Sequence, residues 1–418
     1  MDQTPQQGRR KLDQILNMHG EFRSTIVPLC AAENPLSPYV RSFLSDPIHE
    51  TYAMGGPRIP PPSNFAAAGY VHDLHRMVID LCADAFGSTY ADPRPNSGTS
   101  AVLACLMTLS APGQQIMLQT IDSGGHASMQ PICRRLGLEI LDMPYDFDRL
   151  CPDYDTIRNL PLDEIDFVLY SPSDVLYPDE FKDVVLPEST TLVLDLTQTL
   201  GLIASGHHPS PFDGAHERTV VVGGTHKTLP GPSSGLLLTN HGSIADVLDS
   251  EVSPKYVRHS HPHHMAALCA TMIEHQEIGR HYGDRMLAFS ALLADSLQRS
   301  GQEIVLAESR PSETHQVLVH IDESRVELAF DSCVRAGITL NQRRKPLFRG
   351  AGLRFGVQEI ARYEWSEREV DMCGRLISDA LSQSAPLAEL QQRVQCLSKF
   401  NTFDPMLLSS ERTRTQST

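Results

Sequence analysis

The stretch Val220-Val-Val-Gly-Gly-Thr-His-Lys-Thr-Leu-Pro-Gly-Pro-Ser-Ser-Gly235 is the most informative part of this chain. Its valines are typical of a buried strand, and the glycines and prolines that follow prevent an immediate return to helix. The turn therefore presents Lys227 at a strand end, where it can face a cleft. Burial and neighbouring charge lower the pKa of such an amine and make it nucleophilic enough to form a Schiff base. The alternative is an ordinary solvated turn lysine.

A second buried strand precedes this one in the chain and ends in a carboxylate. Thr191-Leu-Val-Leu-Asp195 is apolar up to its last residue, and a stretch of small residues follows it at 200–206. Pyridoxal 5'-phosphate (PLP) needs a carboxylate that keeps its pyridine nitrogen protonated and a lysine that holds its aldehyde. The two strand ends therefore indicate a PLP site that contains Asp195 and Lys227.

The Thr225-His-Lys-Thr-Leu-Pro-Gly-Pro232 segment, together with Asp195, resembles the serine hydroxymethyltransferase group of fold-type I PLP enzymes. The resemblance implies an α/β fold of the aspartate aminotransferase-like class. We expect a mainly parallel seven-stranded sheet in a large PLP-binding domain and a smaller α+β C-terminal domain. The expected segments are an N-terminal arm at 1–50, the large domain at 51–300, the small domain at 301–400 and a disordered tail at 401–418.

The composition is that of a soluble globular protein with 418 residues, of which 41% are hydrophobic and 21% are charged. The net charge of −16 argues against nucleic acid or an anionic membrane as a partner. We expect no transmembrane helix and no signal peptide, because no apolar run approaches the roughly 18 residues that span a bilayer. Nine scattered cysteines without CxxC spacing predict reduced thiols in a cytoplasmic protein.

A phosphate cradle is predicted where Pro95-Asn-Ser-Gly-Thr-Ser-Ala101 opens an apolar helix. Backbone N–H groups at a helix start attract an anion, and hydroxyl groups there add donors. As a bare N-cap the motif would be commonplace. The family resemblance implies that Ser97, Gly98 and Thr99 bind the PLP phosphate.

Further cofactor contacts follow from the resemblance alone. His126 is expected to lie flat against the pyridine ring, with a solvated turn histidine as the alternative. Ser173 is expected near the phenolic oxygen of the cofactor, a role for which Ser171 competes. Gln198 stands where the family usually has histidine; it can donate a hydrogen bond but carries no proton charge. His226 is expected to contact the phosphate or to steer the lysine amine.

The resemblance also assigns residues to the substrate. Glu33 is expected to shuttle the proton of the substrate hydroxyl, with a surface glutamate as the alternative. Arg354 is expected to clamp the substrate α-carboxylate through a bidentate fork, and Arg362 is a second candidate. Tyr52 lies in the Pro- and Gly-rich loop 52–64 and is expected to reach the cofactor phosphate and substrate of a partner subunit.

We expect a homodimer with shared active sites, in which the first thirty residues form a helical arm on the partner. A loosely packed terminal helix is the alternative. We expect no metal, although His72 and His75 stand three apart and His259-Ser-His-Pro-His-His264 has the composition of a metal tract. The tract corresponds to an interface loop of the family.

Two departures from the family concern folate. The family glutamate two residues after the tyrosine is Met54, which cannot transfer protons, and a proline run replaces the Tyr-Tyr-Gly-Gly motif. The segments Thr314-His-Gln-Val317 and Gly356-Val-Gln358 look similar to those of threonine transaldolases of natural-product pathways. These features favour an aldehyde over folate as the second substrate.

The sequence thus predicts a PLP-dependent transferase with Lys227, Glu33, His126 and Asp195 as catalytic residues. It would cleave the Cα–Cβ bond of a β-hydroxy amino acid, L-threonine, and add the retained glycyl unit to another aldehyde. The alternatives are a serine or α-methylserine hydroxymethyltransferase that uses tetrahydrofolate, and a catalytically inactive scaffold.

Overall fold

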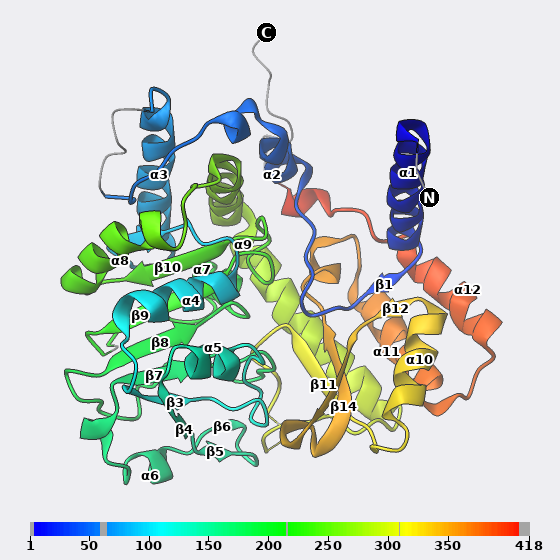
Figure 1. Cartoon of the computed structure of the whole chain (residues 1–418). Coiled ribbons are helices and arrows are strands. Elements are labelled where there is room, and N and C mark those ends of the chain that lie inside the picture. Colours follow the sequence, from blue (N-terminus) through cyan, green and yellow to red (C-terminus); the bar gives the residue numbers. More distant parts are fainter. Residues whose placement is uncertain (1–3, 59–64, 215, 309, 409–418) are drawn as a thin grey trace.

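The larger region of the molecule is built around a seven-stranded sheet (Figure 1). The computed structural model describes residues 4–58, 65–214, 216–308 and 310–408. The strand order is β2-β10-β9-β8-β7-β3-β4. β4, β3, β7, β8 and β9 are parallel, and β10 is antiparallel to both its neighbours. The strands are β2 (Tyr90–Asp92), β3 (Gln115–Leu118), β4 (Glu139–Asp142), β7 (Phe167–Tyr170), β8 (Thr191–Asp195), β9 (Thr219–Gly224) and β10 (Gly235–Thr239). The predicted mainly parallel seven-stranded sheet is confirmed.

The middle strands are apolar throughout because helices cover both faces of the sheet. Every residue of β7, β8, β9 and β10 is buried, as expected for strands with two covered faces. Side chains of α3 (Ala68–Phe86), α7 (Leu200–Ala204) and the first part of α9 (Pro262–Arg299) pack on one face. Those of α4 (Gly98–Leu109), α5 (Met129–Arg135) and α8 (Gly242–Lys255) pack on the other.

A second, smaller region contains an antiparallel sheet of three strands in the order β11-β14-β13. Its strands are β11 (Gln316–His320), β13 (Asn341–Lys345) and β14 (Gly350–Gly356), and its helices are α10 (Val326–Ala336), α11 (Glu367–Ser382) and α12 (Leu387–Ser398). β1 (Val27–Pro28) pairs in parallel with β12 (Ile338–Thr339), so the N-terminal segment joins this region.

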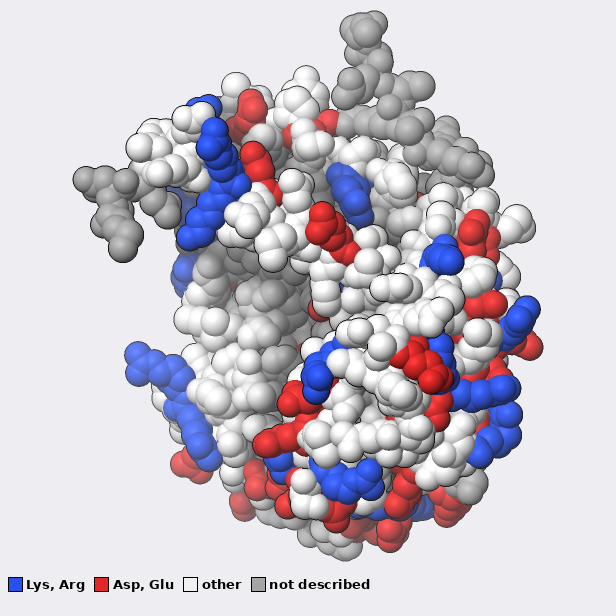
Figure 2. All heavy atoms as spheres, turned by 90° about the vertical axis from the view of Figure 1, so that its right-hand side faces the viewer, with Lys and Arg blue, Asp and Glu red and all other residues white. Residues whose placement is uncertain are grey.

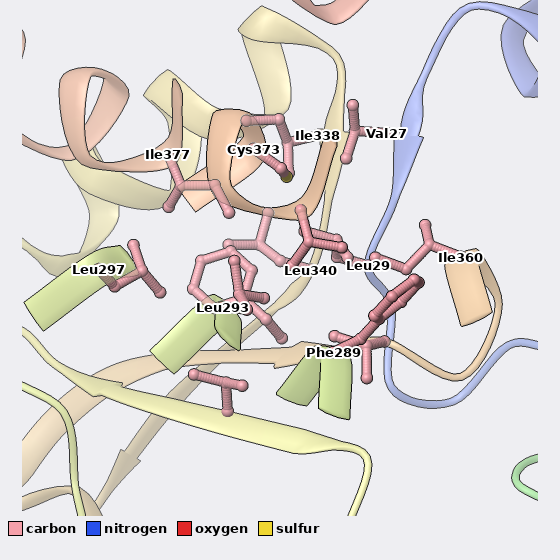
Figure 3. Packing of buried hydrophobic residues seen from close by; sticks show 14 of the residues in the cluster. Val27, Leu29, Phe289, Leu293, Leu297, Ile338, Leu340, Ile360, Cys373 and Ile377 are labelled. Atoms are coloured by element: carbon pink, nitrogen blue, oxygen red, sulfur yellow. The ribbon is translucent and has the colours of Figure 1, made fainter. Parts of the chain in front are cut away.

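The long helix α9 connects the two regions. It is 38 residues long. Leu268 packs in the core of the large sheet, whereas Phe289 and Leu293 pack in the core of the smaller region. In Figure 3 these last two side chains lie close to Leu29 from the N-terminal segment. One continuous helix therefore contributes to both hydrophobic cores.

Short elements complete the described chain. They are α2 (Pro38–Ser42), α6 (Tyr154–Ile157), the pair β5 (Tyr145–Asp146) and β6 (Cys151–Pro152), and the 3-10 helices η1 (Phe43–Ser45), η2 (Pro47–Glu50), η3 (Leu162–Glu164), η4 (Pro346–Phe348), η5 (Ile360–Arg362) and η6 (Pro405–Leu407).

The N-terminal arm is the helix α1 (Pro5–Ser24), which begins with a capping box between Thr4 and Gln7. In Figure 1 most of its length extends away from the other elements, and none of its residues is buried. Leu16 and Met18 are 59% and 60% exposed. The helical arm is as predicted, and its role in dimerisation stays a prediction.

The C-terminal tail begins later than predicted. Asn401 accepts a hydrogen bond from the Trp365 indole (3.0 Å), and Asp404 pairs with Arg285 at 3.1 Å. Residues 401–408 are therefore packed against the smaller region, because these polar side chains find specific partners that composition alone does not reveal. Residues 409–418 of the predicted tail, and 59–64 of the predicted loop, lie outside the described part of the chain.

The surface mixes charges of both signs. Figure 2 shows acidic and basic side chains interspersed over the face formed largely by the C-terminal elements. Within the described residues, no helix combines the length and apolar character needed to cross a bilayer.

Candidate active site

A cavity of about 260 Å³ lies at the carboxyl ends of β8 and β9. Ligands commonly bind at this edge of an open α/β sheet. The lining residues are Ala32, Ser97, Gly98, Thr99, His126, Pro172, Asp195, Thr197, Gln198, His226 and Lys227. The fold thus brings most of the predicted cofactor residues to one place. Arg354, Ser173, Glu33 and Tyr52, also predicted site residues, are not among the lining residues.

Lys227 has the properties of an amine nucleophile. Burial, and after it the charge of Arg354, lowers the pKa of the Lys227 amine to about 8. The backbone holds the residue in place, because its carbonyl accepts a hydrogen bond from the Asn34 side-chain amide. About a tenth of the amine is therefore uncharged at pH 7, far more than for a lysine with an ordinary pKa.

Asp195 is a buried carboxylate that is fixed by neutral donors. The Ser171 hydroxyl donates to its Oδ2 at 3.0 Å. The Thr197 hydroxyl and N–H donate to its Oδ1 at 2.5 and 3.1 Å. The same Thr197 hydroxyl accepts from the Gly224 N–H at 2.7 Å, which ties the carboxylate to the end of β9. No cation contributes to these contacts, so the negative charge stays available to a positively charged ring nitrogen.

The predicted phosphate cradle is the first turn of α4. Ser97 is its N-cap and accepts from the Ser100 N–H at 3.1 Å. The first intrahelical hydrogen bond is donated by the Ala101 N–H to the Ser97 carbonyl. The N–H groups of Gly98 and Thr99 come before it and therefore have no acceptor within the helix. A Cβ on Gly98 would lie 3.0 Å from the Gly224 nitrogen and from the Thr197 hydroxyl oxygen. The glycine therefore lets the start of α4 lie close to the end of β9 and to Thr197.

Two histidines line the cavity in their neutral form. Burial lowers the pKa of His226 to about 4, and its Nδ1 is a buried atom without a partner within the described residues. Burial also lowers the pKa of His126. Nδ1 of His126 accepts from the Ser128 N–H at 3.2 Å, so Nε2 carries the proton of the neutral ring.

The Ser173 carbonyl accepts hydrogen bonds from three side chains. The Gln198 amide donates to it at 3.0 Å, Gln316 at 3.1 Å and Arg354 at 2.7 Å. Of the two serines considered for the phenolic oxygen, Ser171 is the one that contacts Asp195. The role of Ser173 at the cofactor stays a prediction.

Arg354, the predicted carboxylate clamp, extends from β14 and is 2% exposed. Its Nε and Nη2 both donate to Asn341 Oδ1, at 3.2 and 2.7 Å, so the fork is directed at a side-chain amide. Its Nη1 donates to Asp174 Oδ1 at 2.8 Å. The guanidinium is therefore held rigidly, and the role of Arg354 as a carboxylate clamp stays a prediction.

Asp174, which the sequence did not single out, collects three cations. Arg354 contacts its Oδ1 at 2.8 Å, Arg343 contacts the same oxygen at 3.0 Å, and Lys345 contacts Oδ2 at 2.5 Å. These cations hold the pKa of Asp174 below its usual range against the opposing effect of burial. One signal in the sequence could have indicated this charged site. Asn341, Arg343 and Lys345 alternate along β13, which places their side chains on one face of the strand.

A serine hydroxymethyltransferase family model matches residues 6–377, most of the chain. The chain belongs to the serine hydroxymethyltransferase family. A serine hydroxymethyltransferase of Methanopyrus kandleri is 30% identical over 392 residues, which cover 90% of each chain. Another, of Thermococcus onnurineus, is 31% identical over 370 residues, which cover 85% of this chain and 86% of that relative.

A solved structure, L-threonine transaldolase from Pseudomonas fluorescens, superposes with a TM-score of 0.88 at 24% sequence identity. The match covers 96% of this chain and 94% of that chain. This likeness shows the fold, and it confirms the predicted fold-type I class.

Family membership indicates PLP binding, and the site fits the cofactor. The N–H groups at the start of α4 suit its phosphate, and Ser97, Gly98 and Thr99 line the cavity. Asp195 suits its pyridine nitrogen, and the Lys227 amine suits its aldehyde. His226 Nδ1 offers a further buried polar atom that lacks a protein partner in the described chain.

Glu33 lies at the surface of the molecule, where it has a cationic neighbour. Its side chain is 56% exposed and pairs with Arg23 of α1 at 3.2 Å. The same arginine contacts the buried Glu359, so the arm helix supplies the cation. Glu33 is placed beside Arg23 by the tertiary structure, because the exposed side of the segment that contains Glu33 faces α1. The proton-shuttle role of Glu33 stays a prediction.

Tyr52 is 41% exposed and stacks on His259, with ring centroids 4.9 Å apart. His261, His263 and His264 follow with rings in contact with one another. In the described residues, no group of three or more His, Cys, Asp or Glu side chains is arranged to hold a metal ion. The expected contact of Tyr52 with a partner subunit stays a prediction.

Proposed function

We propose that this chain is a PLP-dependent threonine transaldolase. It would cleave the Cα–Cβ bond of L-threonine, release acetaldehyde and join the glycyl unit to a second aldehyde. Family membership indicates a PLP-dependent enzyme of the hydroxymethyltransferase-like aldolase and transferase type. It therefore gives the inactive-scaffold alternative no support.

The proposed reaction balances without an external oxidant or reductant. The threonine hydroxyl loses its proton to a base, the Cα–Cβ bond breaks and acetaldehyde leaves, while the electron pair remains at Cα. A new bond then forms between Cα and the carbonyl carbon of the second aldehyde, whose oxygen takes up a proton. The product is a β-hydroxy-α-amino acid with the side chain of the acceptor.

Each site residue would have a separate role in this reaction. PLP supplies the electron sink when it is bound. The Lys227 amine, with its pKa near 8, holds the cofactor aldehyde and exchanges with the substrate amine. The buried Asp195 carboxylate holds the proton on the ring nitrogen. Arg354 would orient the α-carboxylate, and the neutral His126 would limit ring tilt by stacking.

The observation that carries the choice of an aldehyde acceptor is the methionine at position 54. A thioether cannot hold or release a proton, whereas a folate-linked step needs acid–base help. Glu33 could move the proton of the threonine hydroxyl, because its carboxylate is accessible and close to the cationic Arg23. The lack of a carboxylate at position 54 thus favours a reaction that bypasses folate.

A serine hydroxymethyltransferase that uses tetrahydrofolate is the second candidate. The observation in its favour is that relatives about 30% identical over most of their length carry that name. Such a function would need another group to replace the missing carboxylate at position 54.

Absorbance spectroscopy of the holoenzyme tests the proposal. L-Threonine should produce a long-wavelength band and release acetaldehyde without any folate. The Lys227→Ala variant should show neither under the same conditions. If threonine changes nothing while serine turns over only with tetrahydrofolate, the transaldolase proposal is wrong and the second candidate stands.

We further propose that the enzyme is a cytoplasmic homodimer with active sites shared between subunits. The exposed apolar side chains of α1, among them Leu16 and Met18, support an arm that packs on a second copy. The segment boundaries near residues 50 and 300 belong to the same proposal. Size measurement of the full chain and of a variant that lacks residues 1–24 tests the arm, because its removal should shift the protein toward monomer.

A further inference from the structure

The three cations around Asp174 form a second charged site beside the reaction cavity. We name Asp174, Arg343, Lys345 and Arg354 the cation cluster. Arg343 and Lys345 extend from β13 and Arg354 from β14, so one small sheet supplies all the positive charges. Asp174 reaches them from the turn after β7 of the large sheet. The cluster therefore lies where the two regions of the chain meet.

The cluster carries more positive charge than its own residues neutralise. Three cations and one carboxylate leave a formal excess of two positive charges. Asp174 has a fully buried side chain, and those of Arg354 and Lys345 are 3% and 7% exposed. Buried charge is costly unless it is paired, and the whole chain is acidic, with a net charge of −16. Such an excess indicates a place for anionic ligands.

One anion does not account for this excess. The α-carboxylate of the amino-acid substrate, expected at Arg354, brings a single negative charge. One positive charge then remains, and Arg343 is the member best placed to meet another ligand. Its side chain is 23% exposed, and its Nη2 makes no hydrogen bond within the described residues. Its Nε is used by Asp174, which fixes the direction of the guanidinium.

The cluster adjoins the reaction cavity. The Ser173 carbonyl accepts from both Arg354 and the cavity-lining Gln198. The Asp174 N–H donates to the Gly124 carbonyl at 3.1 Å, two residues before His126. Arg343 is also near enough to act electrostatically on the Lys227 amine. A ligand that reaches Arg343 is therefore close to the atoms that react.

We propose that Arg343 and Lys345 select an acceptor aldehyde that carries an anionic group at the end away from its carbonyl. The group would be a carboxylate, a phosphonate or a phosphate, with Arg343 as its main contact and Lys345 as supporting charge. This inference rests on the proposed transaldolase function and names its second substrate class. Arginine suits the role because its planar fork matches these anions.

The first test compares acceptors that differ in charge. The holoenzyme receives L-threonine with succinic semialdehyde, phosphonoacetaldehyde or the neutral butanal, and the new β-hydroxy amino acid is quantified. We expect kcat/KM for at least one anionic acceptor to exceed that for butanal by about tenfold or more. Arg343→Gln should lower the anionic value by about 10- to 100-fold and leave the butanal value within about threefold. Arg343→Lys should restore part of the loss.

Arg344→Gln is the matched control. Arg344 is the next residue on the same strand, but it points to the other face, where it pairs with Glu327 and is 45% exposed. Its substitution removes the same charge and should leave every acceptor unchanged. The KM for L-threonine should also be unaffected in all three variants, because Arg354 is intact. Equal preference for butanal, or equal losses in the 343 and 344 variants, would overturn the inference.

A binding measurement separates this inference from the proposed function. Calorimetry with holoenzyme and either ethylphosphonate or butyrate, in the presence of glycine to occupy the α-carboxylate position, reports the anion site without any aldol step. Binding that Arg343→Gln weakens about tenfold supports the site even if threonine is not cleaved, in which case only the transaldolase function fails. If threonine is cleaved but neither ethylphosphonate nor butyrate binds, the anion site is wrong and the transaldolase remains.

Discussion

Two buried aspartates at the carboxyl edge of one sheet serve opposite electrostatic purposes. Asp195 ends β8 and accepts hydrogen bonds from the Ser171 hydroxyl and from Thr197, all neutral donors. Asp174 follows β7 and is contacted by three cations. The first carboxylate keeps a net negative charge for a ligand, whereas the second is outnumbered and sits in a positive environment. The donors around a carboxylate, more than its burial, determine which ligand its surroundings can take.

The comparison has a structural basis. The donors of Asp195 come from the large sheet itself, through the turns after β7 and β8. The cations of Asp174 come from the smaller region, on β13 and β14. Under the proposed function, the large sheet would supply the residues that hold the cofactor, and the smaller region would add the charges that recognise substrates. The predictions below test this division.

Removal of the Lys227 amine should have the largest effect. Lys227→Ala should lower the rate of threonine cleavage by more than about 10⁴-fold, the upper end of what one positioned proton-transfer group supplies. The fold should persist, because the buried amine makes no ion pair within the described residues and its loss removes an unfavourable burial of charge. Single-turnover kinetics and a thermal melt check both statements. Cleavage at a rate near that of the wild type would contradict the role of Lys227.

Exchange of each aspartate for asparagine should separate the two sites. Asp195→Asn should lower kcat by about 10²- to 10⁴-fold, because the ring nitrogen loses its negative partner, with a change in stability of only about 1 kcal/mol. Asp174→Asn should lower the free energy of unfolding by about 3–5 kcal/mol, since it leaves buried cations unpaired. Urea denaturation and steady-state kinetics on both variants test the contrast. Equal loss of stability in the two variants would refute it.

The lowered pKa of Lys227 predicts a pH dependence. Only the uncharged amine captures PLP covalently, so the capture rate of the apoenzyme should rise about tenfold per pH unit below pH 8 and level off above it. Stopped-flow absorbance at a series of pH values measures this rate. A rate that continues to rise up to pH 10 would show that the amine has an ordinary pKa.

Substitution of Gly98 should have the smallest effect among these changes. In Gly98→Ala the new methyl group would lie 3.0 Å from the Gly224 nitrogen and the Thr197 hydroxyl oxygen. It should push the start of α4 away from the end of β9, so PLP affinity should fall about tenfold. Gly69→Ala is the control, because a Cβ at Gly69 has no atom within 4 Å and the residue lies in α3. Equilibrium dialysis of PLP compares the two variants. Unchanged affinity in Gly98→Ala would contradict a phosphate cradle at that position.

Features that depend on local pattern were predictable from the sequence. The strand that ends in Asp195 has the predicted bounds, and the Lys227 turn follows a strand as expected, because apolar runs and Gly-Pro turns are local signals. The start of α4 was predictable for the same reason, since its N-cap lies within the motif.

Features that depend on distant contacts were missed. Lys345 meets Asp174 across 171 residues of sequence, so neither residue alone suggested a charged site. The pairing of Glu33 with Arg23 of α1 is a tertiary contact that the motif around Glu33 does not reveal. The packed stretch 401–408 looked like a disordered tail because its partners, Trp365 and Arg285, come from elsewhere in the chain.

The most direct test of the central claim is a product balance with isotopically labelled L-threonine. The holoenzyme is incubated with labelled threonine and an acceptor aldehyde in the complete absence of folate. The account predicts acetaldehyde and a new β-hydroxy-α-amino acid in equal amounts, with the label of the glycyl carbons retained in the amino acid. No acetaldehyde without folate, together with serine turnover that requires tetrahydrofolate, would contradict it.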